Sequence, residues 1–304
     1  VEIHNGKSSS SDVYFEMTSL MLTQPDLLNL DQVWRYLDDG SDPAGRNDRT
    51  CWTMPEYDDS NWKTNLGYQA KFGALTNQIA DLGNDAVPTV KLQQYLNGTT
   101  INTPAFFFRT TFEMNSLPEA GYMLTGNIKY DDAVIIYING KKIASLGEPE
   151  NGFETNLSYG GTNAIEPQDA VFRMDASSLQ LGTNVIAVEL HQGRASSPDV
   201  YFELSSLNFT LTQQKNHSLT VGSDESQRNV SWYVNSEIPG TVEYAVKGDN
   251  IFPADYISVQ AQASHASNYV GYYANKATMT GLQPNTTYVY RLVNGSTVSD
   301  VYTF

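Results

Sequence analysis

Short runs in which apolar and polar residues alternate recur along most of the chain. The clearest are residues 106–112, 133–138 and 184–190, which are rich in β-branched and aromatic residues and are bounded by Gly, Asn, Asp or Pro. A period of two places successive side chains on opposite faces of a strand. Asn139-Gly140 follows the second run and predicts a two-residue hairpin, because both central positions of a type I′ turn need positive φ.

No run keeps the period of an amphipathic helix for longer than a turn or two. Residues 26–37, 91–96 and 174–181 have a composition that fits short helical turns. Short strands at regular spacing favour antiparallel sandwiches over parallel α/β units. The pattern therefore predicts an all-β protein.

The first 23 residues repeat a later segment of the chain. Residues 1–23 align without gaps on residues 188–210, and 14 of the 23 positions are identical. Either a longer protein carries tandem copies of this unit, or residues 1–24 dock as strands into the sheet of another chain. The first residue is not Met and the chain opens in a strand-like run, which favours a processed or excised piece of a longer protein.

A polar run near residues 212–218 separates two periodic regions. We therefore expect residues 1–24 to be the terminal strands of a preceding or partner unit. Residues 25–213 form one sandwich, and residues 214–304 form a second, smaller one.

The larger region carries a set of ordered phrases: VWRYLDDGSDPAG, YDDSNWKTNLGY, FFFRTTFEM, KYDDAVIIYINGKKIA and LGTNVIAVELHQ. Together they resemble the galactose-binding-like jelly roll, an accessory domain of many secreted proteins. The resemblance implies a jelly-roll β-sandwich.

The smaller region contains HSLTVGSDESQRNVSWYV, GTVEYAV and KATMTGLQPNTTYVYRLVNGSTVSDVYTF. Alternation places Val230, Trp232 and Val234 on one face of a strand. The region resembles a fibronectin type III sandwich and, more narrowly, the N-terminal sandwich of purple acid phosphatases, which ends in a strand such as Tyr302-Thr303-Phe304. In that family a metallophosphoesterase domain follows, so the resemblance leaves open such an activity for a longer parent protein.

The chain itself lacks the residues for that chemistry. A dinuclear phosphoesterase needs Asp, Asn and several His side chains around two metal ions, whereas this sequence has four His and no His-x-His or Gly-Asn-His phrase. His4 and His191 occupy the same position of the repeat, each two residues after a Glu, and a structural role at a strand end is the favoured interpretation. We expect this chain not to be an enzyme.

The composition excludes some classes of binding partner and site. With 34 acidic and 18 basic residues the net charge is −16, which disfavours nucleic acid and anionic membrane surfaces. No apolar run reaches the roughly 20 residues that a membrane span needs. The one cysteine, Cys51, excludes an internal disulfide and a Cys-rich metal site.

Two weaker ligand predictions concern loops of the larger region. The acidic residues that could supply oxygen ligands to a structural Ca²⁺ are Asp38, Asp39, Asp42 and Asp48, although their spacing differs from an EF-hand and a local turn role is the alternative. No other cofactor is expected. The loop residues that suit carbohydrate binding are Tyr68, Phe72, Gln78, Asn151, Phe153, Tyr159 and Asn163. The alternative is that these aromatic rings pack onto their own domain.

Asn-x-Ser/Thr sequons predict N-glycosylation if the protein is secreted from a eukaryotic cell. They begin at Asn97, Asn156, Asn208, Asn216, Asn229, Asn285 and Asn294.

Three functional hypotheses follow. The first is a non-catalytic extracellular or cell-surface glycoprotein with a structural or adhesive role, which assembles into filaments through residues 1–24. The second is the accessory, glycan-binding front region of a larger purple-acid-phosphatase-like enzyme. The third is a free-standing lectin-like module.

Overall fold

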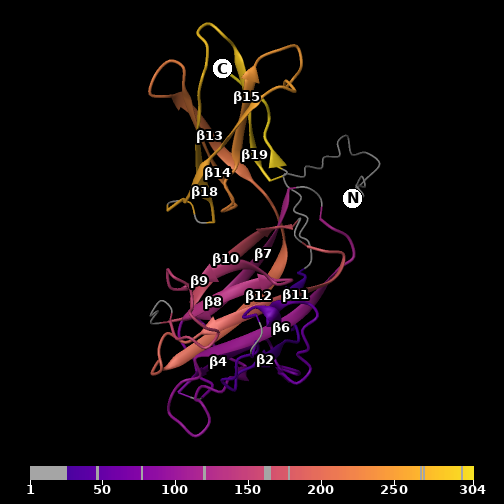
Figure 1. Ribbon diagram of the computed structural model, residues 1–304, viewed down its shortest axis with the longest axis vertical. Coiled ribbons are helices and arrows are strands. Elements are labelled where there is room, and N and C mark those ends of the chain that lie inside the picture. Colours follow the sequence, from indigo (N-terminus) through magenta and orange to yellow (C-terminus); the bar gives the residue numbers. More distant parts are fainter. Residues whose placement is uncertain are drawn as a thin grey trace, which may run out of the picture.

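The computed structural model describes residues 26–304 except 46–47, 77, 119–120, 161–165, 177–178, 268, 270 and 296. Nearly all regular elements within these residues are strands, and the helical residues among them are the 3₁₀ turn η1 (Cys51–Thr53) and Ala176. The strands form four sheets in two sandwiches (Figure 1), which confirms the all-β prediction. None of the helices described is long and apolar enough to cross a membrane.

The N-terminal sandwich is built from two facing sheets, each of six strands. Sheet A has the order β10-β7-β12-β4-β5 with β1 paired to β12, and sheet B has the order β3-β2-β6-β11-β8-β9. The strands are β1 (Leu28–Asn29), β2 (Arg35–Leu37), β3 (Lys63–Thr64), β4 (Lys71–Leu75), β5 (Val90–Lys91), β6 (Ala105–Met114), β7 (Tyr122–Asp131), β8 (Ala133–Ile138), β9 (Lys141–Leu146), β10 (Gln168–Asp175), β11 (Gly182–His191) and β12 (Asp199–Leu211).

Aromatic side chains fill the space between the two sheets. Phe108 of β6 lies with its ring centroid 5.0 Å from that of Phe202 on β12 and 4.8 Å from that of Phe72 on β4. Trp34 meets Phe202 edge to face at 5.8 Å. All four residues are fully buried, and such pairs contribute beyond the area they bury.

The outer face of sheet B is covered as well. Phe107, which points away from Phe108, packs against Trp52 with 5.1 Å between ring centroids. Trp52 and Trp62 belong to the segment that crosses this face, and Tyr137 of β8 lies beneath them. Burial on both faces explains why β8 is an almost continuous apolar run.

The β8–β9 hairpin confirms the turn predicted at Asn139-Gly140. The two residues have φ values of 48° and 83°, as a type I′ turn requires. A side chain at Gly140 would also meet the Met54 sulfur at 2.1 Å from its Cβ.

The expected helical turns are largely wrong. Residues 26–37 contain β1, which pairs with β12, and β2, which pairs with β6. Residues 91–96 form no helix. Residues 174–175 complete β10, but Ala176 after them has 3₁₀ conformation and accepts a hydrogen bond from Leu179 N at 3.1 Å, so a short turn is present there as expected. Because main-chain pairing and burial outweigh weak local propensity, composition alone misassigned these segments.

The C-terminal sandwich has the same two-layer design on a smaller scale. Sheet D has the order β13-β14-β18-β17, and sheet E has the order β16-β15-β19-β20 with β21 paired to β19. The strands are β13 (Gln214–Val221), β14 (Arg228–Val234), β15 (Thr241–Val246), β16 (Ile257–Gln260), β17 (Gln262–His265), β18 (Tyr273–Met279), β19 (Tyr288–Asn294), β20 (Thr297–Val298) and β21 (Tyr302–Thr303). Val230, Trp232 and Val234 are buried in its core as predicted.

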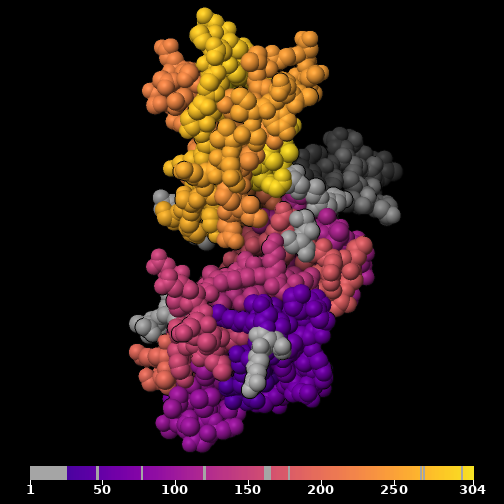
Figure 2. All heavy atoms as spheres, in the orientation of Figure 1, coloured from indigo at the N-terminus to yellow at the C-terminus, as the bar shows by residue number. Residues whose placement is uncertain are grey.

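Two residues, Thr212 and Gln213, connect β12 to β13. Asn235 of the C-terminal sandwich accepts a hydrogen bond from Gln213 N at 2.7 Å and donates one to Leu211 O at 3.0 Å. The Tyr272 hydroxyl donates to Gln213 Oε1 at 2.9 Å. The two sandwiches therefore follow each other without a free linker, as Figure 2 shows.

Candidate functional site

The most deeply buried polar cluster surrounds the end of β11. Glu189 and His191 project from the same face of the strand, and both are at most 1% exposed. Glu189 Oε1 lies 2.8 Å from His191 Nε2 and 3.0 Å from Arg49 Nη2, and Glu189 Oε2 accepts a hydrogen bond from the Tyr137 hydroxyl. Burial, followed by the negative charge of Glu189, raises the pKa of Tyr137.

Both ring nitrogens of His191 face acceptors. Nδ1 lies 2.7 Å from the Ser158 carbonyl oxygen, opposite the contact that Nε2 makes with Glu189. Phe153 stacks on the imidazole with 3.6 Å between centroids and 8° between planes. Since an imidazole satisfies two acceptors only when it carries both protons, the geometry suits a buried imidazolium paired with Glu189. This enclosed arrangement supports the structural role expected for the strand-end histidine, while His4 lies outside the described residues.

A second buried cluster contains three carboxyl groups. Asp131 ends β7, Asp132 follows it, and Asp199 begins β12. Asp132 Oδ2 accepts a hydrogen bond from Gly193 N at 2.6 Å. Burial, followed by the neighbouring charge of Asp132, raises the pKa of Asp131 to about 9, and burial with the same charge raises the pKa of Asp199 to about 6. The cluster therefore holds protons that the unfolded chain would release.

The predicted calcium ligands do not come together. Asp38 is 1% exposed, pairs with Lys63 Nζ at 2.7 Å and accepts a hydrogen bond from Gln93 N. Asp39 caps its own turn at Ser41, as Asp48 does at Thr50. Asp42 accepts from Ala44 N and from Asn156 Nδ2.

The bonds of Asp39, Asp42 and Asp48 within their own turns are the local roles that short acidic side chains favour, whereas Asp38 pairs with distant residues. Across residues 26–304, apart from the masked positions, no three His, Cys, Asp or Glu side chains are grouped as metal ligands. The calcium prediction gains no support from the geometry of these four residues.

The predicted carbohydrate loop residues are also dispersed. Phe72 lies in the core with 0% exposure and Phe153 is 5% exposed against His191, so neither offers a face to a sugar. Tyr159 donates its hydroxyl proton to Asn102 O. Of the others, Tyr68, Gln78 and Asn151 are exposed on separate loops, and Asn163 lies outside the described residues. Loop aromatics that pack on their own domain were the alternative interpretation, and Phe72 and Phe153 follow it.

Two of the seven sequons are unsuitable for a glycan in the folded protein. Asn156 is 1% exposed, and its Nδ2 donates to Asp42 Oδ1 and Arg49 O. Asn294 is 4% exposed and accepts a hydrogen bond from the Trp232 indole at 2.8 Å. The remaining five residues are exposed or half-buried: Asn97, Asn208, Asn216, Asn229 and Asn285.

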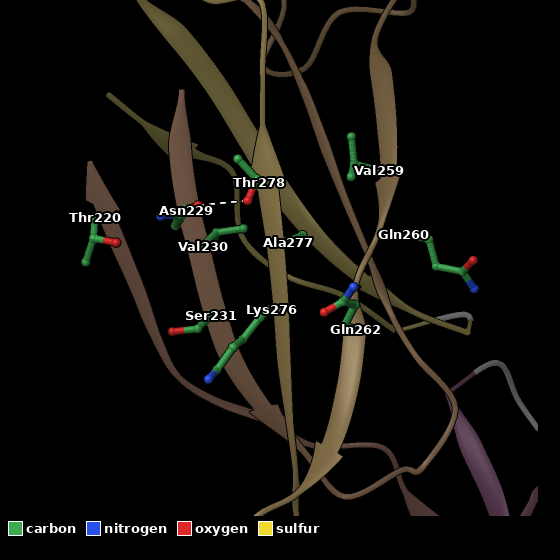
Figure 3. Close-up of a pocket in the computed structure, with 10 residues that line it drawn as sticks. All are labelled: Thr220, Asn229, Val230, Ser231, Val259, Gln260, Gln262, Lys276, Ala277 and Thr278. Atoms are coloured by element: carbon green, nitrogen blue, oxygen red, sulfur yellow. Dashed lines mark hydrogen bonds between the residues drawn. The ribbon is translucent and has the colours of Figure 1, made fainter. Parts of the chain in front are cut away.

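A shallow hollow lined by strands of sheet D and by β16 of sheet E is an open site that the sequence did not reveal (Figure 3). It has a volume of about 550 Å³. The lining residues are Thr220, Asn229, Val230, Ser231, Val259, Gln260, Gln262, Lys276, Ala277 and Thr278. Their types are ordinary for a solvent-facing sheet, so the only advance signal was a lack of acidic residues in these strands.

Comparison with known protein families finds a match for the C-terminal sandwich. Residues 214–304 match the family model described as "Purple acid Phosphatase, N-terminal domain". The resemblance stated from the phrases of that region is therefore confirmed. A comparison with curated proteins finds no match.

Solved structures with a similar arrangement include a glycosyl hydrolase family 2 member from Bacteroides cellulosilyticus. It is 14% identical, with 91% of this chain and 35% of that chain covered and a TM-score of 0.32. A β-glucuronidase from Ruminococcus gnavus is 12% identical, with 96% and 46% covered and a TM-score of 0.32. The chain spans less than half the length of these structures. At such identities and TM-scores the likeness indicates no shared function.

The described residues thus comprise two β-sandwiches, and the C-terminal one matches the N-terminal domain of purple acid phosphatases. The buried Glu189–His191 cluster is closed to solvent, so it suits a role in stability.

Proposed function

We propose that the chain is a non-catalytic scaffold of an extracellular or cell-surface protein, built from sandwich units. In this proposal residues 1–24 supply two strands to a jelly-roll unit other than the chain's own N-terminal sandwich. The unit that accepts them is either a preceding tandem repeat or a second copy of the chain.

The proposal rests on which positions are identical between residues 1–23 and residues 188–210. Ten of the 14 identical positions are buried in the later copy: Val188, Glu189, His191, Ser197, Asp199, Val200, Tyr201, Phe202, Glu203 and Leu207. Exposed positions differ more, as in Lys7 against Arg194. A segment that keeps these side chains needs the same environment, since unpaired buried charges and empty core positions are costly.

That environment is already occupied in this chain. Strand β12 lies between β7 and β4, and the end of β11 lies between β6 and β8. Residues 1–24 therefore have no second position of this kind in their own N-terminal sandwich. Strand addition to another sheet supplies main-chain hydrogen bonds, and alternate side chains set the register.

The extracellular location and glycosylation remain part of the proposal. Exposed asparagines in sequons support them, at Asn97, Asn216 and Asn285. A glycan attached at any of these positions would extend into solvent and would not clash with the packed core.

A second function is favoured by the family match of residues 214–304. The chain would then be the accessory front region of a larger purple-acid-phosphatase-like enzyme. Its scaffold role would be the same, with a catalytic domain supplied by the longer protein.

Deleting residues 1–24 tests the scaffold proposal. We expect the unfolding midpoints of both sandwiches in urea to stay unchanged, because the deleted segment belongs to another unit. As a matched comparison, Phe202→Ala in the intact chain should lower the stability of the N-terminal sandwich by about 3–5 kcal/mol. Loss of folding in the deleted chain would overturn the proposal.

Light scattering on the intact chain distinguishes the two acceptors. Exchange between copies predicts that the average molar mass of the intact chain rises with protein concentration. The same rise should occur in Ser9→Asp but not in Phe15→Asp. A concentration-independent monomer identifies a tandem repeat. Ser9 aligns with exposed Ser196 and Phe15 with buried Phe202, so the pair separates docking from a general charge effect.

A further inference from the structure

The outward face of sheet D differs in charge from the rest of the chain. Its strands β13, β14, β17 and β18 contain no Asp or Glu, and Lys215 and Lys276 lie on this face. The whole chain has 34 acidic and 18 basic residues. An acid-free, weakly basic face is therefore a local feature, and it attracts anions that the rest of the surface repels.

Strand register gathers polar side chains across this face. Ser231 on β14 lies opposite Lys276 on β18, and Lys276 lies opposite Gln262 on β17. In the neighbouring row, the Thr278 hydroxyl donates to Asn229 Oδ1 at 2.8 Å, which fixes the amide (Figure 3). These two rows line the hollow of about 550 Å³, a size typical of small-ligand sites.

Several of these groups have unused hydrogen-bonding capacity. In the described part of the chain, no hydrogen bond or ion pair engages the side chains of Ser231, Gln260, Gln262 or Lys276. They supply a hydroxyl, two amides and an ammonium group to one hollow. A ligand with many hydroxyl groups would find both donors and acceptors there.

Aromatic rings stand at one end of the same face. Tyr233 follows Ser231 by two residues, so it shares the outward face, and its ring lies 5.6 Å from that of Tyr269. Tyr269 stacks on Tyr272 at 4.6 Å and 27°, and it is 36% exposed. Lys215 Nζ lies 4.8 Å from the Tyr272 ring centroid, which places a cation beside the platform.

We propose that this face binds a short acidic oligosaccharide, with its carboxylates toward Lys276 and Lys215 and a sugar face on Tyr269. Amides and hydroxyls pair with sugar hydroxyls, and an aromatic ring packs on the C–H face of a pyranose. Two lysines are too few to hold a long polyphosphate against a net charge of −16. The site lies in the C-terminal sandwich, apart from the loops that the sequence indicated.

Calorimetry on the full chain, produced without glycosylation so that Asn229 is unmodified, tests the site. The probes are a galacturonate tetramer, an uncharged galactose tetramer and a single-stranded oligonucleotide, each at up to about 1 mM. We expect the galacturonate tetramer to bind most tightly, with an affinity that falls as salt is added. Lys276→Gln should weaken binding about tenfold, as loss of one charge-assisted hydrogen bond does.

Tyr269→Ala should weaken binding of the acidic and the neutral tetramer by a similar factor, because the packing of a sugar ring on Tyr269 does not depend on the carboxylate charge. Lys247→Gln, which removes an exposed cation beside sheet E, is the matched control and should leave binding unchanged. The proposal is overturned if the acidic tetramer does not bind, if the neutral tetramer or the oligonucleotide binds more tightly, or if Lys276→Gln and Lys247→Gln behave alike.

Discussion

Replacing Glu189 with alanine is expected to lower the free energy of unfolding of the N-terminal sandwich by about 3–5 kcal/mol. The carboxylate is 1% exposed and contacts His191, Arg49 and Tyr137. Its removal leaves a buried cation and a buried hydroxyl without their acceptor, and this cost exceeds the value of the ion pair itself. Urea unfolding followed by tryptophan fluorescence measures the change.

Asp169→Ala is the matched control for the loss of a carboxylate. Asp169 pairs with Lys129 at 3.3 Å, but its side chain is 80% exposed. Exposed pairs contribute about 0–1 kcal/mol, so this variant should unfold almost as the parent does. A Glu189→Ala variant that matches Asp169→Ala would show that the cluster does not stabilise the fold.

Raising the pH from about 4.5 to about 7.5 is expected to destabilise the N-terminal sandwich. The folded pKa is about 6 for Asp199 and about 9 for Asp131, both above the ordinary value of 3.8. Above pH 4 the unfolded chain therefore releases protons that the folded chain still holds, and stability falls. The fall due to Asp199 ends near pH 6 and that due to Asp131 near pH 9. Asp199 alone accounts for on the order of 3 kcal/mol.

Carboxyl groups whose pKa is lowered in the folded chain have the opposite effect on stability, which they increase as the pH rises. Hydrogen bonds from neighbouring residues lower the pKa of Asp48, Asp58 and Asp224, so their contribution is lost only as the pH falls below about 4. Denaturant unfolding at several pH values isolates the buried cluster. Asp199→Asn should flatten the profile between pH 4.5 and 6, and Asp169→Asn should not. An unchanged profile in Asp199→Asn would contradict the assignment.

Short runs of β-branched and aromatic residues bounded by turn residues were sufficient to predict several of the long strands. The runs 106–112, 133–138 and 184–190 fall within β6, β8 and β11, because each presents a face to a packed core. Asn139-Gly140 specified its hairpin through a backbone requirement that few residues meet. Residues 26–37 were misassigned because β1 and β2 are short, and their strand character comes from pairing with β12 and β6.

The burial of the predicted site residues could not be read from the sequence. Phe72 and Phe153 have the residue type that a sugar platform needs, yet the first belongs to a core strand and the second covers His191. Asn156 carries a sequon, but distant Arg49 and Asp42 bury its amide. The hollow on sheet D depends on cross-strand register, which places Ser231, Lys276 and Gln262 side by side although they are far apart in sequence. No local sequence pattern predicts that these three residues lie side by side.

If residues 1–23 and 188–210 are equivalent, either segment can fill the strand position between β7 and β4, and a graft measures this. In a chain that lacks residues 1–24, residues 188–210 are replaced by the sequence of residues 1–23, which changes 9 of the 23 positions because 14 are identical. We predict that the grafted N-terminal sandwich folds, with an unfolding midpoint in urea near that of the parent. A graft that also carries Asp at the position of Phe202 should fail to fold. A plain graft that fails to fold would contradict the equivalence of the two segments, because residues 1–23 would then be unfit for the strand position that they are proposed to fill.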